Sequence, residues 1–258
     1  MLSLKEIEKY YPKNLSVFKR HLLREYLQYE ILQFIFDTEY AKKLSLIGGT
    51  CLRIVHNNKR FSEDLDFDNW ELKEKDFQTI TEILKKQLQN EGYKVEIRNV
   101  YKGAYRCYIK FPGLLFDKAL SGHREEKILI QLDTQAQGFD YKSENHFLNK
   151  FDVFMQIFTT PLDILLSQKF FAIFNRATPK GRDFFDIIFL LSKTQPNYAY
   201  LDLKLGINKS RELKGRLIKK CESIDLKEIA EEVKPFLFNP ADTKQITLFT
   251  KYIDYLEW

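Results

Sequence analysis

Residues 44–67 read LSLIGGTCLRIVHNNKRFSEDLDF and are the most informative stretch of the chain. The apolar run 44–47 predicts a short strand, and the glycines after it predict a turn. Glycine has no Cβ, so the backbone N–H groups of Gly48 and Gly49 can approach an anion, and the Thr50 hydroxyl would add a donor. We therefore expect Gly48, Gly49 and Thr50 to bind a phosphate group.

Two carboxylates follow this turn. Asp64 and Asp66 alternate with Leu65 and Phe67, so an extended strand places both carboxylates on one face. Carboxylates near a phosphate-binding turn suit a hard divalent cation that carries a nucleotide. Taken alone, each motif is more often an ordinary turn or a solvated strand edge, and it is their order and spacing that favour a nucleotide site. Asp68 continues the alternation, and we expect it to be structural or to support the site.

Composition limits the class of protein. The chain has 258 residues, of which 44% are apolar, enough for one large domain or two modest ones. No apolar run approaches the roughly 20 residues of a membrane-spanning helix, and the N-terminus does not resemble a signal peptide. We expect a cytoplasmic protein with no membrane partner. The three scattered cysteines favour neither a disulfide framework nor a zinc site, and a net charge of +5 permits a nucleotide or RNA partner.

Hydrophobic periodicity predicts a mixed α/β part followed by a helical part. Strands are expected over residues 44–47, 65–69, 94–100, 104–111, 127–134 and 151–158. Helical segments are expected over residues 3–38, 51–56, 73–90, 161–175, 181–192, 208–221 and 246–257. We predict two domains: residues 1–158 with the N-terminal helices and the core, and residues 159–258 as a helical domain that completes the site.

Asp133 is the candidate for a third carboxylate. It closes the apolar strand ILIQLD, and such a strand often delivers its last residue to a site at the sheet edge. A cap or turn role is the alternative. With Asp64 and Asp66 it would complete a three-carboxylate site able to hold two Mg²⁺ ions about 3.5–4 Å apart.

A second group of charged residues lies in the predicted helices. Lys169 is surrounded by apolar residues, where a lysine either extends to water or meets an anion such as a triphosphate. Asp183 and Asp186 are three residues apart and share a helix face. One of them could pair with Lys169 or an arginine, and one could act as a base toward an attacking hydroxyl. An acidic helix start beside a surface basic cluster would give the same pattern.

Basic residues are concentrated beside and after this group. Arg176, Lys180 and Arg182 flank the two aspartates, and a later helix carries Lys209, Arg211, Lys214, Arg216, Lys219 and Lys220. Such a surface can bind an RNA backbone, with an affinity that falls steeply with salt. A solvated helix face is the alternative, because Glu212 and Glu222 dilute the cluster.

These segments stand in the order typical of one family. They are IGGTCL at 47–52, RFSEDLDF at 60–67, LD at 132–133, LLSQK at 165–169 and RDFFD at 182–186. Together they resemble the AbiEii toxin family of the DNA polymerase β-like nucleotidyltransferase superfamily, and Arg60-x-Ser62-x-Asp64-x-Asp66 is the most specific piece. The resemblance implies an α+β fold: a polymerase β-like nucleotidyltransferase core, with a mixed sheet flanked by helices, followed by a C-terminal helical domain.

The resemblance also implies a function. Family members are toxins of type IV toxin–antitoxin or abortive-infection systems, and some attach a nucleotide to the 3′ end of tRNA. It implies an NTP substrate, Mg²⁺ or Mn²⁺, an RNA acceptor and a nearby antitoxin gene whose product need not bind directly. The acceptor could also be a small molecule or a protein hydroxyl. A third hypothesis is a nucleotide- or RNA-binding protein with a silent site.

The resemblance assigns roles to individual residues. It implies metal ligation by Asp64 and Asp66, a phosphate contact from Lys169 and a catalytic role for Asp183. Asp133 is the less secure third ligand, because its strand register is open. The nucleotide would further contact the turn residues and the start of the later helix, namely Gly48, Gly49, Thr50 and Arg182. An acceptor hydroxyl would attack the α-phosphorus in line, and pyrophosphate would leave.

Overall fold

The computed structural model describes residues 1–257, and the chain forms two units. The first unit contains residues 1–55 and 61–159, and the second contains residues 56–60 and the chain from Thr160 onward. Compared with the predicted boundary, the segment 56–60 groups with the helical unit although its neighbours on both sides belong to the first unit.

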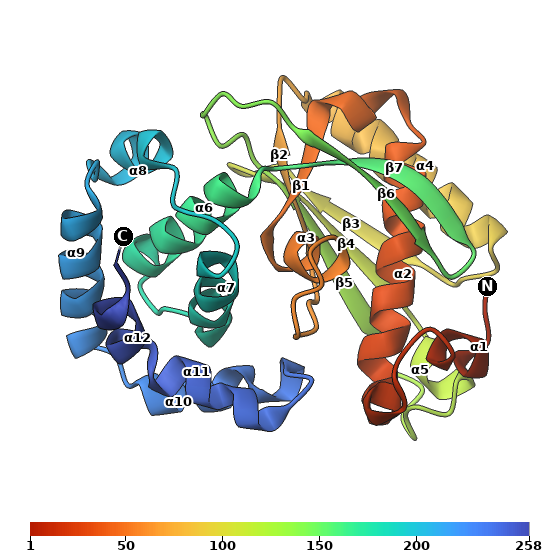
Figure 1. The fold of residues 1–258 in the computed structure, drawn as a ribbon. Helices are drawn as coiled ribbons and strands as arrows, with labels where there is room; N and C mark the ends of the chain where they lie inside the picture. Colours follow the sequence, from red (N-terminus) through yellow and green to blue (C-terminus); the bar gives the residue numbers. More distant parts are fainter. Residues whose placement is uncertain (258) are drawn as a thin grey trace. The chain divides into compact units, whose positions relative to one another are not determined.

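The first unit is built on a seven-stranded mixed sheet (Figure 1). Its strands are β1 (Leu44–Ile47), β2 (Leu65–Asn69), β3 (Glu96–Val100), β4 (Tyr105–Phe111), β5 (Ile128–Thr134), β6 (Glu144–Lys150) and β7 (Val153–Thr159). The order across the sheet is β3-β4-β5-β2-β1-β7-β6. The pairs β1–β7 and β2–β5 are parallel, and the others are antiparallel. The predicted α+β class with a mixed sheet is confirmed.

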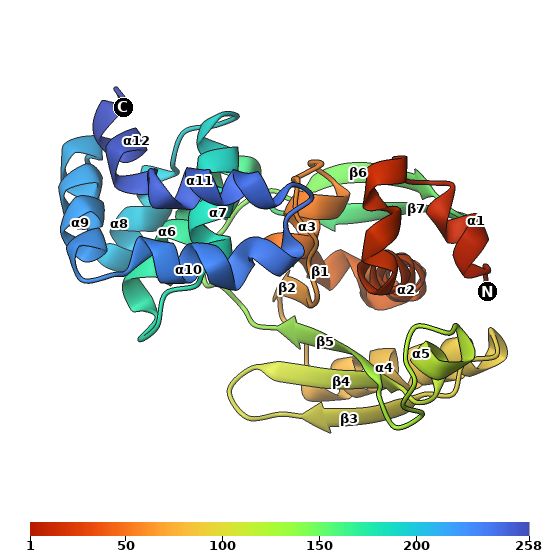
Figure 2. The same ribbon diagram turned by 90° about the horizontal axis from the view of Figure 1, so that it is seen from below.

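Helices cover this sheet and close its core. They are α1 (Leu4–Glu8), α2 (Lys19–Phe36), α3 (Gly48–Ile54), α4 (Glu74–Asn90) and the short α5 (Leu114–Asp117). Helix α2 packs on β7 and on α4, and α4 packs on β3 and β4, as Figure 2 shows from below. One apolar face of α4 is buried, with Phe77, Ile80 and Leu84 no more than 1% exposed.

The N-terminal helices and one edge strand of the first unit differ from the prediction, and the short α5 was not predicted. Residues 3–38 are not one helical stretch: a 3₁₀ helix over Lys13–Phe18 separates α1 from α2. Pro12 precedes this break, and proline has no N–H for an α-helical interior. The edge strand β6 was not predicted. Its sequence ENHFLNK buries only Leu148, so it lacks the apolar alternation that identifies a strand.

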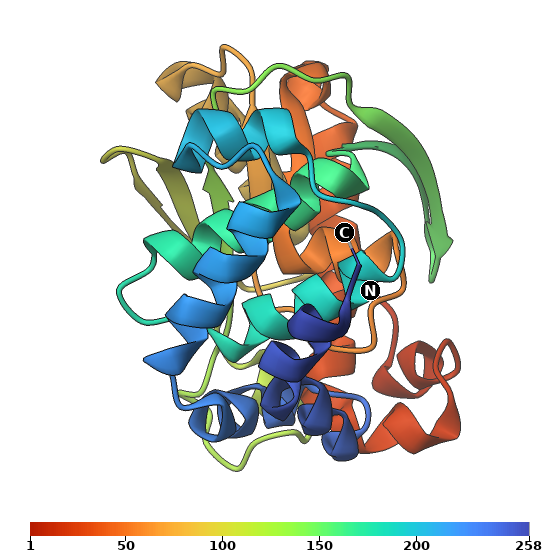
Figure 3. The same ribbon diagram turned by 60° about the vertical axis from the view of Figure 1, so that its left-hand side comes forward.

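The second unit is helical (Figure 3). Its helices are α6 (Leu162–Asn175), α7 (Gly181–Leu191), α8 (Tyr198–Leu205), α9 (Ser210–Glu222), α10 (Leu226–Val233), α11 (Thr243–Thr247) and α12 (Phe249–Tyr255). Helix α7 packs on α6 and α10. A Cβ at Gly181 would lie 2.1 Å from the Ile229 carbonyl oxygen, so glycine permits the close approach of α7 to α10. Helices α8 and α10 were not predicted. None of the helices within residues 1–257 has both the length and the apolar content needed to cross a membrane.

Candidate functional site

In the first unit, the turn after β1 is built around Gly48. Its φ is +72°, and a Cβ there would lie 2.5 Å from the Asp66 Oδ2 atom. The backbone of Gly48 therefore lies directly against the Asp66 carboxylate, an approach that any other residue would block. Helix α3 begins at this glycine, three residues before the predicted helix start at Cys51.

Thr50 forms a hydrogen bond within the first unit. The side chain is fully buried, and its hydroxyl donates a short hydrogen bond to the Asp64 carbonyl oxygen. The hydroxyl has one proton, so it cannot also donate that proton to a phosphate. In this structure Thr50 holds the start of the Asp64–Asp66 segment, and its contact with a phosphate stays a prediction.

Asp66 and Asp133 are neighbours on adjacent strands. In the parallel β2–β5 pair, Leu65 is opposite Leu132 and Asp66 is opposite Asp133. Side chains in register on strands about 4.8 Å apart point to the same face, so these two carboxylates lie side by side. This register is the feature that the sequence left open. On the other side of Asp133, its β4 partner Arg106 places Nε 3.5 Å from Asp133 Oδ1.

The two carboxylate oxygens of Asp133 differ in their hydrogen bonds, although Oδ1 also has the Arg106 ion pair. Oδ2 accepts a 2.8 Å hydrogen bond from Gln131, whereas the buried Oδ1 accepts none within the described residues. Burial raises the pKa of Asp133, while the Gln131 hydrogen bond and the Arg106 charge oppose the rise. A hard divalent cation would coordinate a partly desolvated carboxylate oxygen of this kind, because such cations prefer oxygen ligands.

The ligand type fits a divalent cation, but a three-residue cluster is not assembled. Among residues 1–257, no three His, Cys, Asp or Glu side chains gather closely enough to hold a metal ion. The in-register pair Asp66 and Asp133 supplies the oxygen ligands that Mg²⁺ and Mn²⁺ prefer. Asp64 lies two residues before Asp66 and would have to complete the set when the ion binds.

Asp68 is a buried residue that forms structural hydrogen bonds. It is 2% exposed and accepts 2.8 Å hydrogen bonds from the Gln137 backbone N–H and from the Tyr141 hydroxyl. These bonds fasten the segment after β5 to β2, which helps to keep the two strands in register.

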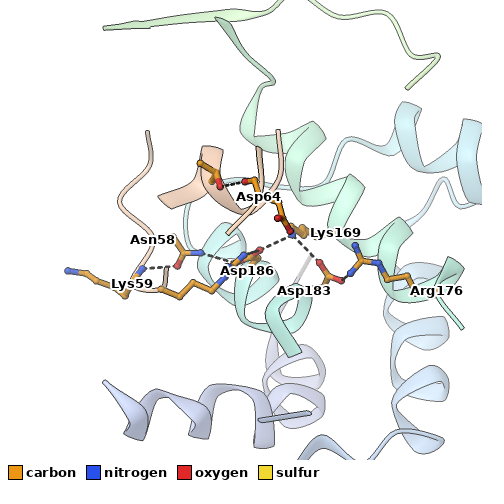
Figure 4. Close-up of polar contacts among 9 residues, drawn as sticks. Asn58, Lys59, Asp64, Lys169, Arg176, Asp183 and Asp186 are labelled. Atoms are coloured by element: carbon orange, nitrogen blue, oxygen red, sulfur yellow. Dashed lines mark hydrogen bonds and ion pairs between the residues drawn. The ribbon is translucent and has the colours of Figure 1, made fainter. Parts of the chain in front are cut away.

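In the second unit, Lys169 joins two aspartates (Figure 4). Lys169 projects from α6, and its Nζ lies 3.0 Å from Asp183 Oδ1 and 2.8 Å from Asp186 Oδ2, both on α7. Burial lowers the pKa of Lys169, but the two carboxylates outweigh this effect and leave the pKa raised. The two aspartates therefore offset the charge of this buried lysine.

Asp186 is the most heavily bonded residue of this group. It is fully buried and accepts from Arg60 Nε at 2.7 Å, Arg60 Nη2 at 2.6 Å and Asn58 Nδ2 at 2.8 Å. Burial opposes its ionisation, but Arg60 and Lys169 outweigh burial and lower its pKa to about 2. These bonds explain why residues 56–60 group with the helices. The sequence allowed one of the two aspartates to pair with an arginine but did not identify Arg60 or Asn58 as partners of Asp186, because both lie more than a hundred residues away.

Asp183 is held less completely. Its side chain is 2% exposed and accepts from Lys169 and, at short range, from Arg176, whose side chain is 49% exposed. Because Arg176 is half exposed, its guanidinium can reach water, and its departure would free the Asp183 Oδ2 atom. Arg182 lies next to Asp183 in sequence, and its guanidinium carbon stands 4.8 Å from the centre of the Phe236 ring.

Comparisons with known proteins agree with this fold. Residues 31–256 match the family model described as "Nucleotidyl transferase AbiEii toxin, Type IV TA system". JHP933 from Helicobacter pylori superposes with a TM-score of 0.51 at 19% identity, over 91% of this chain and 94% of that one. An H. pylori protein described as a "putative nucleotidyltransferase" gives 0.54 at 19% identity, over 93% and 98%. At this identity the structures support the fold alone. No curated protein matches the chain.

Proposed function

Because the chain belongs to the AbiEii nucleotidyl transferase toxin family of type IV toxin–antitoxin systems, we propose that it transfers a nucleoside monophosphate from an NTP to RNA, at the 3′ end of tRNA. The observation that carries the proposal is the in-register pair Asp66 and Asp133 beside the Gly48 turn. A cytoplasmic location, where NTPs are available, and a cognate antitoxin that need not bind the toxin directly belong to the same proposal.

The first unit would bind the metal and the phosphates. Asp64 and Asp66 are the proposed ligands of Mg²⁺ or Mn²⁺, with Asp133 as the third. When bound, such an ion neutralises negative charge that develops on the phosphoryl oxygens. The backbone N–H groups of Gly48 and Gly49 would face the phosphates, and the Thr50 hydroxyl supports this arrangement by fixing the Asp64 carbonyl.

The second unit would contribute positive charge and one carboxylate. We propose that Lys169 and Arg182 contact the triphosphate, which carries several negative charges that a lysine and an arginine can bind. Asp186 is committed to Arg60, Lys169 and Asn58, and its pKa of about 2 makes it a poor base. Asp183 is therefore the better candidate for the residue that accepts the proton of the attacking hydroxyl.

A labelling assay tests the proposal. Purified protein is incubated with Mg²⁺, total tRNA and each α-labelled NTP in turn. Asp66→Ala should lower the rate by at least about 100-fold, the size of losing one electrostatic group in an active site. Asp117→Ala, which removes an exposed aspartate on α5, is the matched control and should keep the wild-type rate.

The assay also separates the other acceptors. If protein or small molecules in a lysate become labelled while tRNA does not, the acceptor hydroxyl belongs to one of them and not to tRNA. NTP binding without any transfer would show that the site is silent. Equal activity of wild type and Asp66→Ala would show that Asp66 is not a metal ligand.

A further inference from the structure

The helical unit has an open groove between α6 and α9 that the proposed reaction does not use. Its volume is about 570 Å³, and it is lined by Phe174, Arg216, Lys219, Lys220, Glu222 and Ser223. Phe174 lies near the end of α6, and the other residues lie along or just after α9. The groove thus combines three cations, one carboxylate and one aromatic ring.

The arrangement of α9 puts its cations in one row. Arg216, Lys219, Lys220 and Ser223 are spaced at i, i+3, i+4 and i+7, so they share one face of the helix. The adjoining face, with Leu213, Leu217 and Cys221, is buried in the unit. The basic row is therefore presented outward by a helix that is held rigidly by its apolar side.

The cations of the row are not equally available. Arg216 already donates to Glu212 and to the Leu205 carbonyl oxygen. Lys219 and Lys220, in contrast, form no ion pair with any of residues 1–257, although the Glu222 carboxylate lines the same groove. The pair Lys219 and Lys220 is thus the positive charge of the groove that no ion pair within the described residues offsets.

We propose that this groove binds a single-stranded segment of the acceptor RNA, with backbone phosphates on Lys219 and Lys220 and a base stacked on Phe174; this rests on the proposed transfer to RNA. Single-stranded nucleic acids are bound by basic grooves whose aromatic rings stack with bases. An anionic membrane fits less well, because the apolar face of α9 is buried and cannot insert. An acidic peptide would offset the charge of the two lysines, but it has no base to stack on the Phe174 ring.

Binding is measured by fluorescence anisotropy of a labelled 20-nucleotide single-stranded RNA, without NTP. Lys219→Gln/Lys220→Gln should weaken binding about tenfold and reduce the slope of log K against log salt by roughly 1.4, because each phosphate contact on a single strand contributes roughly 0.7. The matched control is Lys85→Gln/Lys86→Gln, two adjacent exposed lysines on α4, which should have no effect beyond the loss of net charge.

The aromatic part of the proposal has its own variants. Phe174→Ala should weaken single-strand binding by about tenfold without changing the salt slope, whereas Phe174→Trp should retain it. A blunt RNA duplex, whose bases are already stacked, should bind Phe174→Ala as well as wild type. Thermal unfolding of each variant checks that the helical unit is intact.

Several outcomes would overturn the proposal. Equal losses for the two lysine pairs, or a Phe174→Ala variant that binds the single strand normally, would exclude this groove. Tighter binding to DNA of the same sequence would also exclude RNA as the occupant. So would groove variants that no longer bind anionic vesicles or polyglutamate but still bind RNA. If wild type labels tRNA while the groove variants behave normally, only the groove is excluded; if the groove binds RNA but no label is transferred, only the proposed reaction fails.

Discussion

Replacement of Asp186 by alanine should be among the most destabilising single changes in the helical unit. Its carboxylate is fully buried and is the partner of Arg60, whose side chain is 2% exposed. Removing it breaks the 2.6 Å ion pair of a buried guanidinium, and loss of one partner from a buried pair typically costs about 3–5 kcal/mol. Lys169 loses less, because it keeps Asp183 at 3.0 Å.

Thermal unfolding measures this loss. For a chain of this size each kcal/mol corresponds to roughly 2–4 °C in Tm, so Asp186→Ala should lower Tm by about 6–20 °C. The two units need not unfold together, so hydrogen exchange of the α7 amides should be followed beside the overall signal. We expect the protection of α7 to fall with Tm.

Asp183→Ala is the matched control. It removes an equally buried aspartate from the same helix, but Lys169 keeps Asp186 and the half-exposed Arg176 can turn into water. Its Tm should therefore fall much less. In addition, Arg60→Met/Asp186→Leu should recover much of the loss, because an apolar pair leaves no buried charge. The reasoning is refuted if Asp186→Ala costs no more than Asp183→Ala, or if the double variant is as unstable as Asp186→Ala.

Three further predictions follow from the first unit. Gly48→Ala should lose about 2–4 kcal/mol of stability because it adds backbone strain and a clash with Asp66; Gly206→Ala, with φ +65° and open space around it, should lose only the strain contribution, and equal losses would exclude the clash. Glu30 is buried against Tyr26 and Tyr93, and burial raises its pKa to about 7, so the native state keeps a proton that the unfolded chain releases. Stability should fall by up to about 3 kcal/mol between about pH 4.5 and pH 7, as measured by urea unfolding, and Glu30→Gln should flatten this dependence. Finally, Mg²⁺ at 100 times its Kd should stabilise the wild type by about 2.7 kcal/mol but leave Asp66→Ala unchanged in a thermal shift assay; equal shifts would show that Asp66 is not a ligand.

Local patterns predicted much of the fold. Strands β1 and β2 have the predicted bounds, and α4 begins one residue later than expected. These elements carry their own signals, because a buried run or an apolar stripe appears directly in the sequence. β6 carries no such signal, since an edge strand with one buried side chain looks like a loop.

The candidate site also contains features with a local sequence signal and features without one. The Gly48 turn and the Asp64–Asp66 alternation were recognisable because their geometry is local. The use of the Thr50 hydroxyl was not, because its acceptor, the Asp64 carbonyl, is chosen by the way α3 packs beside β2.

The sequence by itself therefore determined the strand–turn–strand motif, the candidate carboxylates and the family to which the chain belongs. Only the tertiary structure decided the register that sets Asp66 beside Asp133 and the pairing of Arg60 with Asp186 across 126 residues. The physical reason is that strand register and buried ion pairs depend on which distant segments pack together. That choice minimises buried unpaired charge and apolar exposure over the whole unit, and no short stretch of sequence contains it.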